Sequence, residues 1–482
     1  MSVRQQQDKA EALGRSRLAY VAASLILLIP CFWQARLQAG DLSSHLYNAW
    51  LAQLIEGGQA PGLAIARQTT NILFDRMLSG ILRVAGAGAA QRIAVSLAVL
   101  VFLWGAFAFV SAASGRPAWS VLPVIAMLAY GWVFHMGFFN FYMSLGLCFG
   151  VLALCWEWRP RRWAAAIPLL AAAWLAHALP VAWALSLLAY LWLARQMRPR
   201  TRLCLLAASL SALILVRVIL NARMHTLWFP TQLLTATGVD QVWVFDAKYI
   251  LIVFELLLLW GFAFVGLVRQ SRLAGIAASI PFHFCVLTAF AILVLPTEVL
   301  IPGYKHSLAF IADRMSLALG ICICALLGGV RNRAGQNYLM ATVVLLFFGF
   351  LFRDERVFNA VEDRMERVVS ELPPGQRVIG AIDAPSLRVN ALTHMIDRVC
   401  LGRCYSYANY EPSTAQFRIR VVAANAIVVS TYEDSWALQG GKYVVKERDV
   451  PLYDIGVDQN GRVAQRSLQA GFPVGVSHWD PL

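Results

Sequence analysis

The sequence predicts a mainly α protein, a polytopic transmembrane helical bundle of about eleven spans followed by a small C-terminal α/β extracytoplasmic domain. Hydrophobic residues form 59% of the 482 residues, charged residues only 14%, and the mean hydropathy is +0.60. No single soluble core hides so much apolar surface. The other two observations are a series of apolar runs and the placement of the basic turns between them.

The apolar runs are long enough to cross a hydrocarbon core. The first, Leu18 to Trp33, follows several basic residues and has no convincing small-x-small cleavage site, so we predict an uncleaved signal anchor. Ten further runs lie near 92–113, 118–134, 141–157, 163–178, 180–195, 203–220, 248–268, 273–294, 307–329 and 337–352.

The basic turns predict the orientation. With the N-terminus inside and the C-terminus out, every strongly basic turn falls in the cytoplasm, as the positive-inside rule requires. These turns contain Arg116, Arg159, Arg161, Arg162, Arg195, Arg198, Arg200, Arg202, Arg269, Arg272, Arg331 and Arg333. The net charge of +14 therefore reflects topology, and we expect a multi-pass protein of the inner (plasma) membrane with no nucleic-acid partner.

The first outer loop, about 35–91, contains two predicted interfacial helices joined by "EGGQAPG". The first is "GDLSSHLYNAW". The second begins at Asn71, and we place it on the membrane surface because Asp75, Arg76 and Arg83 are too costly at the bilayer centre. The predicted transmembrane domain then extends over 1–352.

The composition changes after Arg353, which predicts a separate soluble extracytoplasmic domain over 353–482. Runs rich in β-formers, "RVIGAI", "AIVVS", "YVVKE" and "PLYDIGV", together with a helical-looking "LRVNALTHMIDRV", indicate a small α/β fold. Asn460-Gly461 is typical of a hairpin turn. Cys400 and Cys404 lie in this domain, where a disulfide can persist, and a zinc site is disfavoured without further His or Cys nearby.

Asp41 and His45 are the leading catalytic candidates. Residues four apart share one face of a helix, and Asn48 continues that face. One interpretation is an active-site helix at the bilayer edge, and the alternative is the solvated polar face of an ordinary interfacial helix.

A second polar group lies near the outer ends of later spans. Arg217, Lys305 and Arg314 predict a basic cluster suited to phosphate or pyrophosphate. The alternative is that Glu255, Asp313 and Arg314 neutralise one another between helices. The substrate-binding candidates are Asn48, Arg76, Arg217, Glu255, Lys305, His306 and Arg314.

This pattern resembles the GT-C superfamily of integral membrane glycosyltransferases, which includes protein O-mannosyltransferases and lipid A aminoarabinose transferases. "GDLSSHLYNAW" matches the first outer loop, Asp41 the acidic residue, and "APGL" with "TTNILFDRM" the second interfacial helix. The resemblance covers residues 1 to 352 and is architectural. Leu42 stands where the family often has a second acidic residue, so whether a divalent cation is needed stays open.

The resemblance implies transfer of a sugar from a polyprenyl-phosphate donor to a lipid, glycan or protein acceptor on the extracytoplasmic side. Asp41 would act as general base and His45 would orient Asp41 or the acceptor. Two other classes stay open: a transporter or flippase for a lipid-linked or envelope substrate, and a non-catalytic envelope assembly protein. The assembly protein needs no particular role for Asp41.

Overall fold

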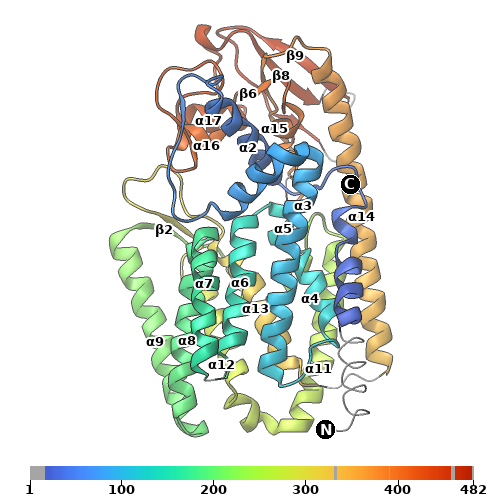
Figure 1. Cartoon of the computed structure of the whole chain (residues 1–482), viewed down its shortest axis with the longest axis vertical. Helices are drawn as coiled ribbons and strands as arrows, with labels where there is room; N and C mark the ends of the chain where they lie inside the picture. The colour runs from blue at the N-terminus through green and yellow to red at the C-terminus, as the bar shows by residue number, and fades with distance from the viewer. Residues whose placement is uncertain (1–16, 158, 331–333, 390, 458–461, 480–482) are drawn as a thin grey trace, which may run out of the picture.

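The computed structural model describes residues 17–157, 159–330, 334–389, 391–457 and 462–479. A bundle of helices forms one end of the molecule, and a mixed layer of short strands and helices covers the other (Figure 1). Asn460-Gly461, Arg331 and Arg333 of the predicted turns lie outside the described residues. The prediction of a mainly helical chain with small C-terminal sheets is confirmed.

Five described helices are long and apolar enough to cross a membrane, which indicates a multi-pass membrane protein. They are α3 (Leu73–Ser114), α8 (Ala178–Gln196), α9 (Pro199–Arg223), α11 (Tyr249–Ala277) and α14 (Ala334–Ser370). The expected count of about eleven spans is wrong by this criterion. The structure supports about five.

The remaining apolar runs form helices of 17 residues or fewer, or are interrupted. The run near 118–134 breaks at Gly131, where a Cβ would lie 2.5 Å from the carbonyl oxygen of Gln241. The shorter helices are the N-terminal apolar helix Arg17–Cys31, which ends in η1 (Ile29–Cys31), and α4 (Leu122–Ala129), α5 (Trp132–Met136), α6 (Phe139–Cys155), α7 (Pro160–Ala176), α12 (Ile280–Val294) and α13 (Ile311–Leu327).

The first outer loop begins with α2 (Leu42–Glu56) and leads into α3. Gly86 has φ 74° and ψ 171°, so α3 is two helices joined at a kink. The kink separates the charged segment that contains Asp75 and Arg76 from the apolar segment after it. The sequence predicted a second helix of the loop starting at Asn71, and the kink at Gly86 marks the end of the corresponding helix.

Two small antiparallel pairs join parts that are distant in sequence. β1 (Leu63–Ile65) of the first outer loop pairs with β7 (Ile419–Val421) of the C-terminal region. β2 (His225–Leu227) pairs with β3 (Glu298–Leu300). In the sequence, β2 is followed by the short α10 (Gln232–Thr235) and η2 (Val239–Val242). The first pair ties the loop bearing α2 to the C-terminal region.

The C-terminal region contains a four-stranded sheet in the order β6-β4-β8-β9 and a two-stranded parallel pair of β5 and β10. β4 is parallel to β6 and β8, whereas β9 is antiparallel to β8. The bounds are β4 Arg377–Ile379, β5 Ile382–Asp383, β6 Tyr405–Ser406, β8 Leu452–Val457, β9 Val463–Leu468 and β10 Ser477–His478, with helices α15 Met395–Val399, α16 Tyr410–Thr414, α17 Tyr432–Gln439 and η3 Glu447–Asp449.

Two predicted strands in this region are wrong. "AIVVS" and "YVVKE" form no strand, although Val429 and Val445 are buried. Their apolar side chains fill a core from irregular segments, and composition alone does not distinguish that from a strand. Among the described residues of the helical-looking run 387–399, only those of α15 are helical.

The predicted boundary near residue 352 falls inside α14, which continues from the bundle into the C-terminal region along one side of the molecule (Figure 1). Buried ion pairs fix the junction. Arg398 binds Glu362 of α14 at 2.7 and 2.6 Å, and Arg388 binds Asp240 at 2.9 Å. The C-terminal region is therefore docked on the bundle.

Candidate functional site

A cavity of about 1040 Å³ lies where the C-terminal region meets the bundle. The bundle and its outer loops contribute the start of α2, the charged end of α3, β2, β3 and the start of α13. The C-terminal region contributes the segment before α15, together with α16, β7 and α17. Both parts of the chain are needed to form it.

Asp41 lies at the N-cap position of α2, but its side chain caps no helical N–H group. Its backbone is fixed instead, because its N–H donates to the carbonyl of Met136 at 3.0 Å and its carbonyl accepts from His45 N–H at 2.9 Å. The carboxylate faces the cavity and is about one quarter exposed. A helix N-terminus favours negative charge there, so Asp41 is an anchored carboxylate whose nearest cationic group in the described part of the chain is His394, at 3.8 Å.

His45 also lines the cavity, but its Nδ1 is 2.6 Å from Asp75 Oδ1 rather than bonded to Asp41. The other oxygen of Asp75 accepts a hydrogen bond from Asn140 at 2.7 Å. Burial alone would lower the pKa of His45, but the negative charge of Asp75 and its hydrogen bond outweigh this and raise the pKa to about 9. His45 is therefore a cation paired with Asp75 at neutral pH.

Arg314, in the first turn of α13, brings a positive charge to the same cavity. Its guanidinium carbon lies 3.9 Å from the centre of the Phe138 ring. The Nε atom is buried and has no hydrogen-bond partner among the described residues. Buried guanidinium donors are normally paired, so this one is available to a ligand.

The other predicted residues divide into two groups. Asn48, Lys305 and His306 line the cavity; Asn48 accepts from Asn409 at 2.7 Å, and His306 Nδ1 lies 2.7 Å from the Tyr432 hydroxyl. Arg76, Arg217 and Glu255 do not line it.

The three that do not line the cavity are placed elsewhere by helix geometry. Arg76 follows Asp75, and a helix turns about 100° per residue, so its side chain is exposed on another face of α3. Arg217 and Glu255 lie on α9 and α11 and are half-buried. The predicted cluster of Arg217 with Lys305 and Arg314 is therefore reduced to the last two.

The C-terminal region supplies site residues that the sequence did not single out: Arg388, His394, Tyr410, Glu411 and Arg418. The pairing of β7 with β1 and the packing of α15 against α2 bring His394, Tyr410, Glu411 and Arg418 to the segment that contains α2 and β1. Burial raises the pKa of Glu411 to about 8, although nearby His45 lowers it in part. The stretch "YANYEPSTAQFRIR", with three acidic or basic residues among aromatics, was the available signal for Tyr410, Glu411 and Arg418.

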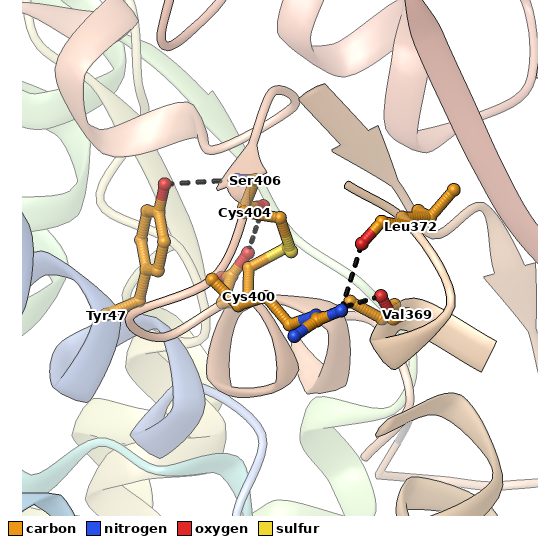
Figure 2. The surroundings of a disulfide bond; sticks show 8 residues. Tyr47, Val369, Leu372, Cys400, Cys404 and Ser406 are labelled. Carbon is orange, nitrogen blue, oxygen red and sulfur yellow. Dashed lines mark hydrogen bonds between the residues drawn. A yellow bond between two sulfur atoms is a disulfide. The ribbon is translucent and has the colours of Figure 1, made fainter. Parts of the chain in front are cut away.

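A disulfide joins Cys400 and Cys404, between α15 and β6 (Figure 2). Just after it, Ser406 N–H donates to the Tyr47 hydroxyl of α2 at 3.0 Å, as Figure 2 shows. On the other side, Arg403 donates to the carbonyls of Val369, in the last turn of α14, and of Leu372, just after this helix. The disulfide loop therefore fastens the cavity wall to both α2 and α14.

A smaller hollow of about 390 Å³ adjoins the cavity at His225 and Leu300, which line both. This hollow lies at the end of α9, whose last residue, Arg223, lines it together with Tyr304. No group of three or more His, Cys, Asp or Glu side chains within the described ranges is placed to hold a metal ion.

Comparisons with known proteins leave this geometry to be interpreted on its own. No protein-family model, no curated protein and no solved structure matches the chain.

Proposed function

We propose that the protein is a membrane glycosyltransferase that moves a sugar from a polyprenyl-phosphate donor to an acceptor hydroxyl. The observation that supports this most is the shared cavity of Asp41 and Arg314. A carboxylate that caps no helical N–H group and a guanidinium whose Nε bonds to none of the described residues are an acceptor and a donor of the kinds this reaction needs.

The donor phosphate binds at Arg314, with Lys305 beside it on the cavity wall. An arginine fork matches phosphate oxygens, and the low dielectric of a partly buried site strengthens the pairing. The lipid tail reaches the cavity past the end of α9, where the smaller hollow lies. Only 6% of the apolar window of α9 is buried in the protein, so this helix has ample surface for lipid.

In the chemical step, Asp41 takes the proton of the acceptor hydroxyl while the hydroxyl oxygen attacks the anomeric carbon. The bond between that carbon and the phosphate oxygen breaks, and the lipid phosphate leaves with both bonding electrons. Arg314 stabilises the charge that develops on the leaving phosphate. One displacement of this kind inverts the anomeric centre.

The positions of the basic turns support an extracytoplasmic site. Arg116 donates to the carbonyl of Gly328 after α13, whereas the cavity is built from the opposite end of α13. Arg202 likewise donates to the carbonyl of Ala194 at the end of α8. Because basic turns are retained in the cytoplasm, the C-terminal region lies outside the cell's inner membrane in this proposal.

The test uses purified protein in lipid nanodiscs with undecaprenyl-phosphate mannose, glucose and aminoarabinose as donors and released undecaprenyl phosphate as the readout. Asp41→Asn is expected to lower turnover by about 10²–10⁴-fold, the usual contribution of general-base catalysis. Glu56→Gln is the matched control, because Glu56 is an exposed carboxylate on the same helix.

Normal release by Asp41→Asn with a folded protein contradicts the role of Asp41. Movement of intact donor across the membrane without release of lipid phosphate would instead show a flippase.

A further inference from the structure

His394 lies between two carboxylates. Its Nε2 is 3.8 Å from Oδ1 of Asp41, and its Nδ1 is 3.3 Å from Oδ2 of Asp397. The imidazole comes from the C-terminal region, just before α15, whereas Asp41 comes from the first outer loop. The side chain of His394 is 13% exposed and lines the cavity.

Asp397 is held so that one oxygen is reserved for this imidazole. Its Oδ1 accepts a hydrogen bond from the Ser406 hydroxyl. Its Oδ2 is buried and has no hydrogen-bond partner among the described residues, with the His394 ring beside it. An unpaired buried carboxylate oxygen is costly, and protonation of His394 at Nδ1 would satisfy it.

The backbone on both sides of this group is fixed. The disulfide lies between Asp397 and Ser406, and Ser406 N–H donates to Tyr47 of α2 (Figure 2). Asn409 donates to Asn48 on the same helix at 2.7 Å. The C-terminal region and the helix of Asp41 are thus joined on the side where His394 approaches Asp41.

We infer that His394, backed by Asp397, is a positioning residue that holds the carboxylate of Asp41 toward the acceptor. This inference rests on the proposed glycosyltransferase function. The two N–H groups of the imidazolium bridge Asp397 and Asp41, which fixes the rotamer of Asp41 and stabilises its charged form. A catalytic hydrogen bond that is long without substrate can shorten when substrate binds.

Other charged groups also act on Asp41 and His394. Arg314 and His306 interact electrostatically with Asp41, and Glu411 interacts with His394. The Tyr410 ring lies 5.5 Å from the His394 ring. Burial lowers the pKa of His394, but the adjacent carboxylate of Asp397, and then the charge of Asp41, raise it overall.

The first measurement is the titration of His394 by NMR of the full-length protein carrying ¹³C,¹⁵N-labelled histidine. Its midpoint is expected to fall in Asp397→Asn and, by less, in Asp41→Asn, because each variant removes a negative charge next to the imidazole. A midpoint that Asp41→Asn leaves unchanged overturns the inference, whether or not turnover is observed.

The second measurement is the pH profile of undecaprenyl phosphate release. His394→Gln is expected to reduce kcat about tenfold or more and to move the acidic limb of the profile to higher pH, because the base loses its cationic neighbour. His478→Gln, an exposed histidine of the same region, is the control and should leave the profile unchanged. A lower kcat with an unmoved limb indicates a structural role only and contradicts the inference. No release by the wild type with any donor contradicts the proposed function instead.

Discussion

Arg398 and Arg314 show how the same residue type serves two ends in one protein. Arg398 is buried at the junction, where it bonds Glu362 twice and also donates to the Leu37 carbonyl at 2.8 Å and to Gln91 at 3.1 Å. Arg314 lies against Phe138 in the cavity. Its Nε is buried and donates no hydrogen bond to any described residue. The fold satisfies one guanidinium and leaves part of the other for a ligand.

The acidic side chains divide in the same way. Glu362 and Asp240 are buried and paired with arginines of the C-terminal region. Asp41 is one quarter exposed, caps nothing and has only His394 within ion-pair distance among the described residues. Satisfied charges hold the two regions together. The cavity between them contains paired charges, such as His45 with Asp75, and also the incompletely satisfied Asp41 and Arg314. This contrast is our reason for proposing Asp41 and Arg314 as functional residues.

The largest expected effect is at the junction. Arg398→Met leaves the buried Glu362 with only the longer ion pair to Arg36, at 3.6 Å, and the hydrogen bond from Gln38. Breaking a buried ion pair from one side costs about 3–5 kcal/mol, and these remaining contacts place the expected cost at the lower end. We expect a clear fall in the melting temperature of the purified protein, followed by loss of the compact C-terminal region in limited proteolysis.

The double variant Arg398→Met with Glu362→Gln removes both charges and is expected to recover part of that loss. If the single variant is as stable as the wild type, the distinction between the two arginines does not hold.

A smaller effect is expected from pH at His45. Its pKa is raised from the ordinary 6.5 to about 9, so its contribution to stability is complete below pH 6.5 and is lost as pH rises through 9. One pKa unit corresponds to about 1.4 kcal/mol, which makes the whole contribution roughly 3 kcal/mol.

The wild type should therefore lose more of its melting temperature between pH 6 and pH 10 than His45→Gln does. Glu411, whose pKa of about 8 is itself lowered in part by His45, also titrates in this range, so the same comparison is made in a Glu411→Gln background, where it isolates His45. Equal slopes for the two proteins would mean that the pair with Asp75 is not ionic.

The sequence predicts one half of the site better than the other. Asp41, His45 and Asn48 are local to one helix, and their spacing of three or four residues places them together on the cavity side. Lys305 and Arg314 were also predicted, because polar residues near the ends of apolar runs are costly and conspicuous. This reasoning identifies each residue separately and does not predict which residues lie close together in the fold.

The residues that were missed depend on long-range contacts. His394 meets Asp41 only because α15 packs on α2, and Arg418 reaches the cavity only because β7 pairs with β1. Arg217 was predicted from its depth in the membrane, but it does not line the cavity. Depth does not set the direction in which a helix faces. The buried "AIVVS" segment was mistaken for a strand because burial and strand formation select the same apolar residues.

The central claim is that the unpaired charge of the cavity accepts a lipid phosphate, and binding of undecaprenyl phosphate tests it without knowledge of the sugar. Native mass spectrometry of the protein with undecaprenyl phosphate and with undecaprenol should show retention of the phosphate lipid alone. A charge-assisted hydrogen bond contributes about 1.5–3 kcal/mol, so Arg314→Gln should weaken binding about tenfold or more while Arg223→Gln, beside the tail, has less effect. Equal binding of both lipids, or undiminished binding by Arg314→Gln, would contradict the account.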